Sequence, residues 1–239
     1  MFNKEMAVNL LNDGIIHAYE EYLSLDEYII FLAKSTRNTN TIQILNEVVS
    51  MTNEEKKKYI AKLIYDGHLT PFEFIDFTFH VTDISRVAVQ QLTRHRIASY
   101  LQESFRHSEV KNFLLPEETY IEMNLKEEYQ EYLDKGMEKD KARYILPMGS
   151  LTNIIFKMNL RSLYNFFNLR LCEKASDEIK QLAYMMVDEI KEYYSEEDIV
   201  YDFLIDFFKP RCAWTGRCRT PCYKYKENIR FYNERFSFK

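Results

Sequence analysis

The sequence has little glycine and proline, five residues of each among 239, and a single tryptophan. Because tight turns depend on Gly and Pro, their scarcity favours long, regular elements. No apolar run approaches the roughly 20 residues that a membrane-spanning helix needs, and the first residues, MFNKEMAVNLL, lack the layout of a signal peptide. We therefore expect a cytoplasmic protein with no membrane partner, folded as one domain around a sizeable core.

Cysteine is also scarce, with Cys172, Cys212, Cys218 and Cys222 as the whole set. In the absence of a secretory signal these residues predict reduced thiols more than a disulfide frame. The last three could bind a metal, but a structural zinc site takes four ligands and the nearest histidine in the sequence is the distant His107. We expect no metal, and we interpret Cys172 as a packing residue unless its thiol proves reactive.

The acidic net charge of −5 is unevenly distributed. Residues 209–239 carry nine Lys or Arg against two Glu, which leaves −12 for residues 1–208. We therefore divide the chain into a main domain, 1–208, and a basic, aromatic C-terminal extension, 209–239. The extension could stack on single-stranded nucleic acid. Alternatively, it packs on the same domain or on a neighbouring subunit.

Strands and helices follow from periodicity and capping residues. Alternating apolar and polar residues predict a half-buried strand at 74–82, and shorter apolar stretches predict strands at 6–12 and 151–158. A capping box at Thr52 and a possible cap at Ser85 each mark the start of a helix. The predicted helices span residues 26–34, 53–66, 86–93, 117–146, 177–193 and about 196–207.

The segment from Arg94 to Arg106, RHRIASYLQESFR, contains no glycine, so it is not a Gly-rich phosphate loop. Any anion bound here must be held by side chains, and guanidinium groups match phosphate oxygens two at a time. Residues 86–106 hold four arginines against one acid, Glu103, within an acidic chain. A solvated basic face would have the same composition. The local contrast in charge nevertheless suits a small anionic ligand.

The spacing Arg94-His95-Arg96, seven residues, Ser104 and Arg106 resembles the signature of the flavin-dependent thymidylate synthases. A second segment, GHLTPFE at 67–73, is similar to another motif of that family, in which the histidine and the threonine lie near the flavin. Without the resemblance, His68 would be interpreted as a helix cap or a surface group.

Two further segments follow in the same order. ARYILP at 142–147 is similar to the family's ARxxLP segment, whose arginine contacts the nucleotide phosphate; Arg143 would otherwise be an exposed helix-end residue. The segment NLRSLYNFFNLR at 159–170 repeats the family's last pattern, and in a helix its Arg161 and Asn165 share one face. The resemblance thus covers residues 68–170.

The resemblance implies an α+β fold, a single domain with a central, mostly antiparallel sheet flanked by helices. It implies an FAD-dependent enzyme that methylates dUMP to dTMP, with 5,10-methylenetetrahydrofolate as the carbon donor and NADPH as the reductant of the flavin, releasing tetrahydrofolate. It also implies a homotetramer whose sites are shared between subunits. All of these ligands are polyanions, which is consistent with many arginines in an acidic chain.

The resemblance also implies roles for individual residues. The catalytic residue would be Arg170, which stabilises charge developing on the uracil. The FAD-binding residues would be His68, Thr70, Arg94, His95, Arg96, Gln102, Asn159, Arg161 and Asn165. The dUMP-binding residues would be Gln91, Arg94, Gln102, Glu103, Ser104, Arg106, Arg143 and Arg170.

The chain departs from the family pattern at several positions: Leu101 stands where members often have Asn, Gln102 where they have Glu, and His107 where they have Tyr. The chain also has ASDEI at 175–179 where they have AQWEI. Two rival interpretations stay open. One is a nucleic-acid-binding protein that uses the basic patch and the extension, which the resemblance does not favour. The other is a flavin- or nucleotide-binding homologue that has lost methylation.

Overall fold

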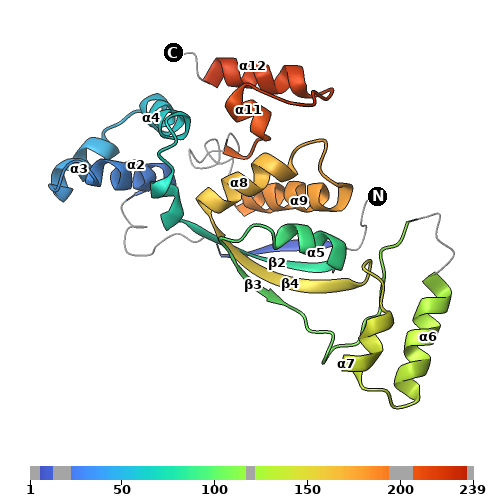
Figure 1. The fold of residues 1–239 in the computed structure, drawn as a ribbon. Helices are drawn as coiled ribbons and strands as arrows, with labels where there is room; N and C mark the ends of the chain where they lie inside the picture. The colour runs from blue at the N-terminus through green and yellow to red at the C-terminus, as the bar shows by residue number, and fades with distance from the viewer. Residues whose placement is uncertain (1–5, 13–22, 117–121, 194–206, 236–239) are drawn as a thin grey trace.

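The computed structural model of the chain describes residues 6–12, 23–116, 122–193 and 207–235. At its centre lies a four-stranded antiparallel sheet in the order β1-β2-β4-β3 (Figure 1). The strands are β1 (Ala7–Asn12), β2 (Asp76–Ser85), β3 (Ser99–Gln102) and β4 (Leu151–Asn159). The antiparallel sheet with flanking helices confirms the predicted α+β fold class.

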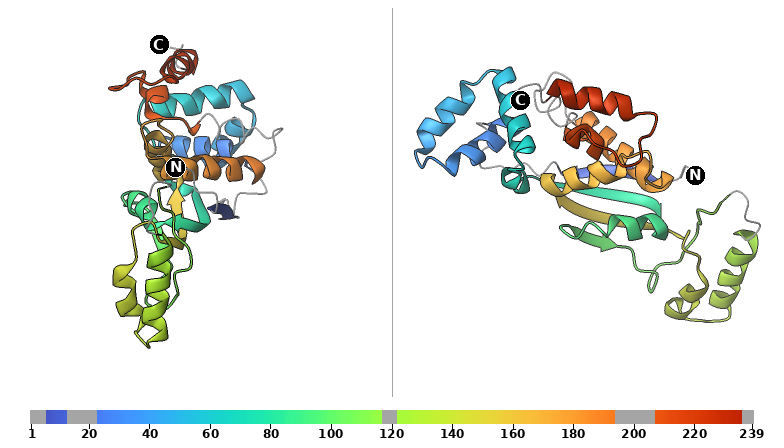
Figure 2. Two further views of the ribbon diagram at one scale, coloured as in Figure 1. Left: turned by 90° about the vertical axis from the view of Figure 1, so that its right-hand side faces the viewer. Right: turned by 45° about the horizontal axis from the view of Figure 1, so that its top comes forward.

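Helices cover one face of the sheet and both of its ends (Figures 1 and 2). They are α2 (Leu25–Ser35), α3 (Thr41–Val49), α4 (Asn53–Tyr65), α5 (Arg86–Leu92), α6 (Glu122–Asp134), α7 (Lys139–Ala142), α8 (Leu160–Arg170), α9 (Asp177–Tyr193), α11 (Arg211–Thr215) and α12 (Tyr225–Arg235), with 3₁₀ helices at Thr70–Phe74 and Arg143–Ile145. Helices α5, α8 and α9 lie on the sheet, and α11 and α12 lie beyond α8. Among the described elements, no helix covers the opposite face of the sheet.

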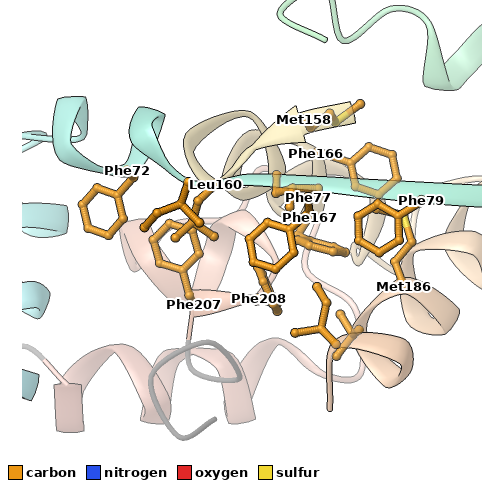
Figure 3. Close-up of a cluster of buried hydrophobic side chains, with 14 of the residues drawn as sticks. Phe72, Phe77, Phe79, Met158, Leu160, Phe166, Phe167, Met186, Phe207 and Phe208 are labelled. Carbon is orange, nitrogen blue, oxygen red and sulfur yellow. The ribbon is translucent and has the colours of Figure 1, made fainter. Parts of the chain in front are cut away.

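The main core lies between the sheet and helices α8 and α9. Phe77, Phe79 and Val81 alternate along β2 and are fully buried, as the sequence pattern predicts. Phe79 is opposite Phe156 of β4, with ring centroids 5.4 Å apart. Figure 3 shows Phe77 and Phe79 packed together with Phe167 of α8. Each buried ring contributes about 1.5–3 kcal/mol of transfer free energy, so this packing fixes α8 on the sheet.

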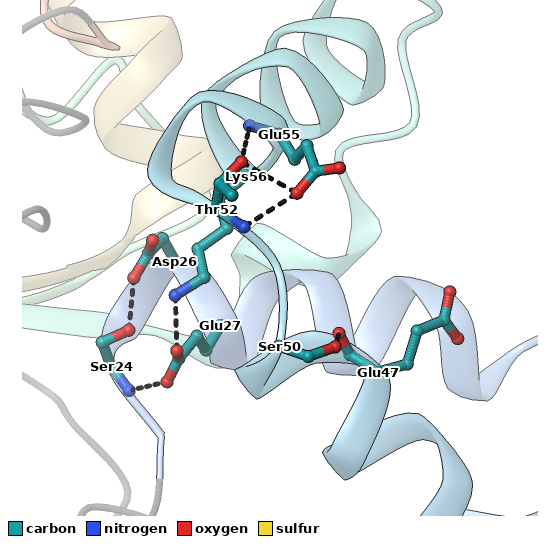
Figure 4. A network of polar contacts seen from close by, with 8 residues as sticks. All are labelled: Ser24, Asp26, Glu27, Glu47, Ser50, Thr52, Glu55 and Lys56. Carbon is teal, nitrogen blue, oxygen red and sulfur yellow. Dashed lines mark hydrogen bonds and ion pairs between the residues drawn. The ribbon is translucent and has the colours of Figure 1, made fainter.

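Capping residues begin two helices as predicted. Thr52 forms a capping box with Glu55 at the start of α4 (Figure 4), and the Ser85 side chain accepts a hydrogen bond from the Ala88 N–H at the start of α5. The buried Lys56 of α4 pairs with Glu27 of α2, which ties the two helices together (Figure 4).

The prediction of one long helix at 117–146 is wrong. Helix α6 ends at Asp134, and Gly136 follows in the left-handed conformation at φ 81°. This conformation terminates a helix and suits glycine, which has no Cβ to clash. The chain then turns back into α7, and a small separate core forms around Phe105 and Tyr129. The predicted helix at about 196–207 lies almost entirely outside the described residues.

Strand β3 has no counterpart among the sequence predictions. It pairs with β4 from Ser99 opposite Lys157 to Gln102 opposite Ile154. Three of its four residues are exposed, so it lacks the apolar alternation by which a half-buried strand is identified. None of the helices in the described residues has the length and apolar character to span a bilayer.

Candidate functional site

The C-terminal ends of α5 and α8 meet at Arg170. Its Nε atom donates to His95 Nε2 at 3.3 Å, and its Nη2 atom donates to the backbone oxygen of Gln91 at 2.9 Å. Burial, and after it the charge of nearby Arg94, lowers the pKa of Arg170. Within the described residues neither guanidinium is paired with a carboxylate. The two therefore concentrate positive charge at one place, where an anion is favoured.

His95 is half-buried and neutral. Its ring packs edge-on against Phe166 of α8 with centroids 5.0 Å apart. Burial, and then the charge of Arg170, lowers the pKa of His95 from 6.5 to about 4. A neutral imidazole can accept the hydrogen bond that Arg170 donates, whereas an imidazolium cannot. His95 thus holds Arg170 in position without neutralising it.

Tyr100 of β3 fixes the chain between α5 and the sheet. The single proton of its hydroxyl is shared between two acceptors, the backbone oxygens of Leu92, at 3.0 Å, and His95, at 2.7 Å. Burial raises the pKa of Tyr100 to about 12, so the proton that makes these bonds stays in place. The backbone of Arg94 and His95 is therefore anchored to the edge strand.

Glu178, near the start of α9, anchors the other end of α5. Its carboxylate accepts hydrogen bonds from Ser85, from the backbone N–H at 2.8 Å and from the hydroxyl. Both side chains are buried, with 9% and 1% exposure. Ser85 also caps α5 through the Ala88 N–H. One buried carboxylate thus sets the position of the helix that carries Gln91.

A second group of predicted residues lies near α7. Arg106 Nε and Arg143 Nη2 both contact Asp140 Oδ1, at 3.1 Å and 2.9 Å. The Arg143 guanidinium also lies 5.7 Å from the ring centroid of Tyr144. One carboxylate between two guanidinium groups leaves a net positive charge. This pair can therefore accept a further anion.

A third group surrounds the start of α8. Arg161 pairs with Glu73 of the 3₁₀ helix Thr70–Phe74, on which Thr70 itself is exposed. His68, two residues earlier, is also exposed. Asn159 caps α8, with its side chain accepting from the Ser162 N–H at 2.8 Å. The segment GHLTPFE and the start of α8 are thus adjacent, as the combined motifs predict.

The remaining predicted residues occupy β3, the loop after it, and exposed positions. Glu103 bonds to β4, accepting from the Asn153 N–H at 3.1 Å, and so has a structural partner. The backbone oxygen of Ser104 accepts from the N–H of His107, at 3.0 Å, and of Ser108. The side chains of Arg96, Gln102 and Asn165 are exposed.

The structure brings these residues together in three groups within one chain. The groups around Arg170 and Arg161 lie at the two ends of α8, and the group around Arg143 lies apart from them, near α7. Arg143 precedes the Leu151 end of β4 and Arg161 follows its Asn159 end. The strand has nine residues. The eight steps between its first and last residues, at about 3.3 Å each, separate its ends by roughly 26 Å. Figures 1 and 2 show α7 and α8 correspondingly far apart.

A basic groove of about 1100 Å³ opens beside Arg170, between the end of α8 and the segment that contains α11 and α12. No Asp or Glu is among the described residues that line it. Its basic residues are Arg170, Lys174, Arg211, Arg217 and Arg219. Most of them belong to the C-terminal extension, so the extension adds positive charge next to Arg170.

Comparison with known proteins assigns the family. A family model described as Thy1, thymidylate synthase complementing protein, matches residues 21–194. A flavin-dependent thymidylate synthase from Saccharolobus solfataricus is 34% identical over 200 residues, covering 68% of this chain and 77% of the relative. The chain belongs to the flavin-dependent thymidylate synthase family. The resemblance drawn from the motifs is thereby confirmed.

Other members of the family are similarly related. A flavin-dependent thymidylate synthase from Pyrococcus abyssi is 33% identical over 198 residues, covering 76% of this chain and 78% of the relative. That of Clostridium tetani is 35% identical over 204 residues, covering 73% and 79%. The C-terminal residues 207–235 lie beyond the part that the family model matches.

A solved structure shares the fold of this chain. It is a UMP/dUMP methylase from Streptomyces cacaoi bound with 5-Br dUMP, with a TM-score of 0.68 and 20% identity, covering 88% of this chain and 99% of that chain. The same enzyme bound with 5-Br UMP aligns with a TM-score of 0.62. At this identity the likeness concerns the fold alone.

Sequence reasoning missed three residues that position the site: Tyr100, Asp140 and Glu178. Tyr100 acts on backbone atoms and Glu178 acts on a residue distant in sequence, so neither leaves a local pattern. Asp140 pairs with the nearby Arg143, but its link to the distant Arg106 leaves no such pattern. The ASDEI segment contained a signal, because Glu178 occupies the place of the acid in the family's AQWEI run.

Proposed function

We propose that this protein is a flavin-dependent thymidylate synthase that converts dUMP to dTMP, with 5,10-methylenetetrahydrofolate as the carbon donor and NADPH as the reductant of bound FAD. The observation that carries the proposal is the pair Arg94 and Arg170 at the junction of α5 and α8. Within the described residues, neither guanidinium group is paired with a carboxylate. Family membership supplies the reaction, and this local charge supports it.

The donor set fits FAD. A flavin dinucleotide carries a diphosphate, which favours guanidinium donors. Arg94 and Arg96 are exposed, and neither forms an ion pair with a carboxylate within the described residues. Arg161, paired with Glu73, would complete the binding set from another part of the surface, with His68, Thr70 and Asn165 nearby.

Bound and reduced FAD would supply the hydride. The chain's own contribution is to bind and orient. Arg170, held by His95 and the Gln91 carbonyl, would donate to the uracil and stabilise negative charge developing at its N3 and carbonyl oxygens. Fixed donors aimed at developing charge commonly contribute about 10²–10³ in kcat. Arg106 and Arg143, pre-arranged by Asp140, would bind the nucleotide phosphate.

Because the three groups of residues are separated within one chain, the proposal includes a homotetramer in which sites combine residues from different subunits. The sheet face that no described helix covers is compatible with such an assembly. The large number of Tyr and Phe residues, 18 and 17, is also compatible with extensive interfaces. We place the enzyme in the cytoplasm, where dUMP and reduced folates are available.

The test is an assay of the purified protein with dUMP, methylenetetrahydrofolate, NADPH and FAD. The protein should purify yellow, and once loaded with FAD it should form dTMP only when dUMP, methylenetetrahydrofolate and NADPH are all supplied. Arg170→Ala should retain FAD and lose dTMP formation. If Arg170→Ala turned over as fast as the wild type, the role of Arg170 would be rejected. A colourless protein that carries salt-removable nucleic acid would instead favour the nucleic-acid-binding alternative.

A further inference from the structure

The basic groove beside Arg170 is built largely by residues that the family model does not match. Its volume is about 1100 Å³, slightly above the roughly 300–1,000 Å³ of pockets for drug-sized ligands. Arg170 and Lys174 line it from the main domain, and Arg211, Arg217 and Arg219 line it from the C-terminal extension. The family match ends at residue 194. The family resemblance therefore gives no role to these three arginines.

The extension is fixed against the end of α8, so the groove has a defined wall. Trp214 of α11 is buried, and its ring meets that of Tyr164 of α8 with centroids 5.6 Å apart. Lys224, in the connection between α11 and α12, pairs with Glu173 at 2.6 Å. Glu173 follows α8 by three residues. One apolar contact and one ion pair thus hold the extension beside Arg170.

The turn after α11 is also closely packed. Gly216 has φ 64°, in the left-handed region, and a Cβ atom at this position would lie 2.8 Å from the Tyr232 ring of α12. Only glycine fits this close approach without a shift of the ring. Arg217 and Arg219 follow directly. Their backbone therefore starts from a fixed point on the groove wall.

The cations of the groove are uncompensated within the described part of the chain. No Asp or Glu of that part lines the groove, and none of the five cations forms an ion pair with a described carboxylate. Four of them are exposed: Lys174, Arg211, Arg217 and Arg219. They line a concave wall, which strengthens their combined attraction for an anion. A ligand with several negative charges would also relieve the repulsion among them.

The reaction leaves one anionic segment without a binding site. The proposed partners of the FAD diphosphate and of the dUMP phosphate lie elsewhere, whereas the folate carbon donor must approach the uracil beside Arg170. Its p-aminobenzoyl ring leads to one or more γ-linked glutamates, each with a free carboxylate. Guanidinium groups match carboxylates two donors at a time. The exposed Tyr65 and Leu169 in the same wall provide apolar surface for the ring.

We propose, on the basis of the proposed synthase function, that the basic groove binds the oligoglutamate tail of the folate carbon donor. Arg211, Arg217 and Arg219 contact its carboxylates. Each added glutamate brings one further carboxylate to the groove. The C-terminal extension thereby makes the protein selective for folates with several glutamates over folates with one.

The test compares methylenetetrahydrofolate carrying one and five glutamates, with the FAD-loaded full chain. We expect the KM to be about tenfold lower for the pentaglutamate, with similar kcat, because several exposed charge pairs act together. Salt at about 0.5 M should remove most of this difference, since exposed charges are then screened. Equal KM values at low salt would overturn the proposal.

Binding of the same two folates is measured separately by isothermal titration calorimetry. This readout needs no turnover, so tail selectivity would be seen even in a protein that forms no dTMP. Conversely, dTMP formation with equal affinity for both folates would reject the tail site and leave the synthase function intact. The two failures are therefore distinguishable.

Variants locate the tail. The double variant Arg217→Ala/Arg219→Ala should reduce the pentaglutamate advantage to about twofold or less. Arg230→Ala is the matched control, because Arg230 lies on α12, pairs with Glu234 at 2.7 Å and does not line the groove. It should leave the advantage unchanged. An equal loss of affinity for both folates in the double variant, or a raised KM for NADPH instead, would overturn the proposal. So would a single-stranded oligonucleotide bound in the groove that pentaglutamate does not displace.

Discussion

Glu178 provides the most quantitative test of how the site is positioned. In Glu178→Ala the buried N–H and hydroxyl of Ser85 lose their shared acceptor. A buried donor left unsatisfied costs about 1–3 kcal/mol, and the second lost bond adds about 0.5–1.5 kcal/mol. We expect the free energy of unfolding to fall by about 2–4 kcal/mol. In a chain of this size that lowers Tm by roughly 5–15 °C.

Glu178→Gln should cost about half as much, because its amide oxygen still accepts from the Ser85 N–H. The matched control is Asp188→Ala on the same helix, whose side chain is 72% exposed and pairs with Lys191 at 3.3 Å. Exposed pairs contribute about 0–1 kcal/mol. Thermal and urea denaturation measure all three variants.

Glu178→Ala also reports on function, because α5 carries Gln91, whose backbone carbonyl accepts a hydrogen bond from Arg170. Well below its Tm, Glu178→Ala should still bind FAD but form dTMP more slowly. If Glu178→Ala lowered Tm no more than Asp188→Ala, the anchoring of α5 by this carboxylate would be refuted. A large loss of Tm with normal turnover would instead limit Glu178 to stability.

Three further predictions concern the other groups of residues. Because the folded state keeps His95 neutral down to pH about 4 while the unfolded chain binds a proton near pH 6.5, stability should fall between pH 6.5 and 4. The free energy of unfolding should change with pH by less than the about 1.4 kcal/mol per pH unit of one full proton, because the ring is partly exposed. His95→Asn should reduce this pH dependence, as measured by urea denaturation at several pH values. An unchanged pH dependence in His95→Asn would contradict the assignment. Arg143→Ala should raise the KM for dUMP about 10- to 100-fold through loss of a charged hydrogen bond, with kcat little changed. Lys141→Ala, two residues earlier in α7 and also ion-paired, should leave the KM unaltered; equal effects would argue against a phosphate role. Arg161→Ala should lower FAD content at purification at least fivefold, and Lys157→Ala, which breaks the nearby pair with an acid of β2, should not; a fully loaded Arg161→Ala protein would remove this residue from the FAD site.

Local signals in the sequence predicted much of the fold. The alternation around Phe77 and Phe79 identified β2, and the capping residues Thr52 and Ser85 located the starts of α4 and α5. These signals work because periodicity and capping are properties of neighbouring residues. The prediction of one helix at 117–146 is wrong because Gly136, in the left-handed conformation, follows the end of α6.

Non-local features could not be predicted in the same way. Strand β3 exists because Ser99–Gln102 pairs with β4, and its exposed side chains carry no pattern of their own. The motifs named residues of the candidate site, but only the fold indicates that Arg94 lies by Arg170 and that Arg106 joins Arg143 through an acid. The fold likewise brings Cys172, Cys212, Cys218 and Cys222 to the wall of one cavity.

The central claim is that the guanidinium group of Arg170 acts on a uracil nucleotide while flavin bound to this chain supplies the hydride. The most direct measurement is a single-turnover experiment with FAD-loaded protein that has been reduced and freed of NADPH, then mixed with dUMP and methylenetetrahydrofolate. We predict one dTMP per reduced flavin from the wild type, none from oxidised protein, and none from Arg170→Ala at equal FAD content. Product from oxidised protein, or undiminished product from Arg170→Ala, would contradict the account.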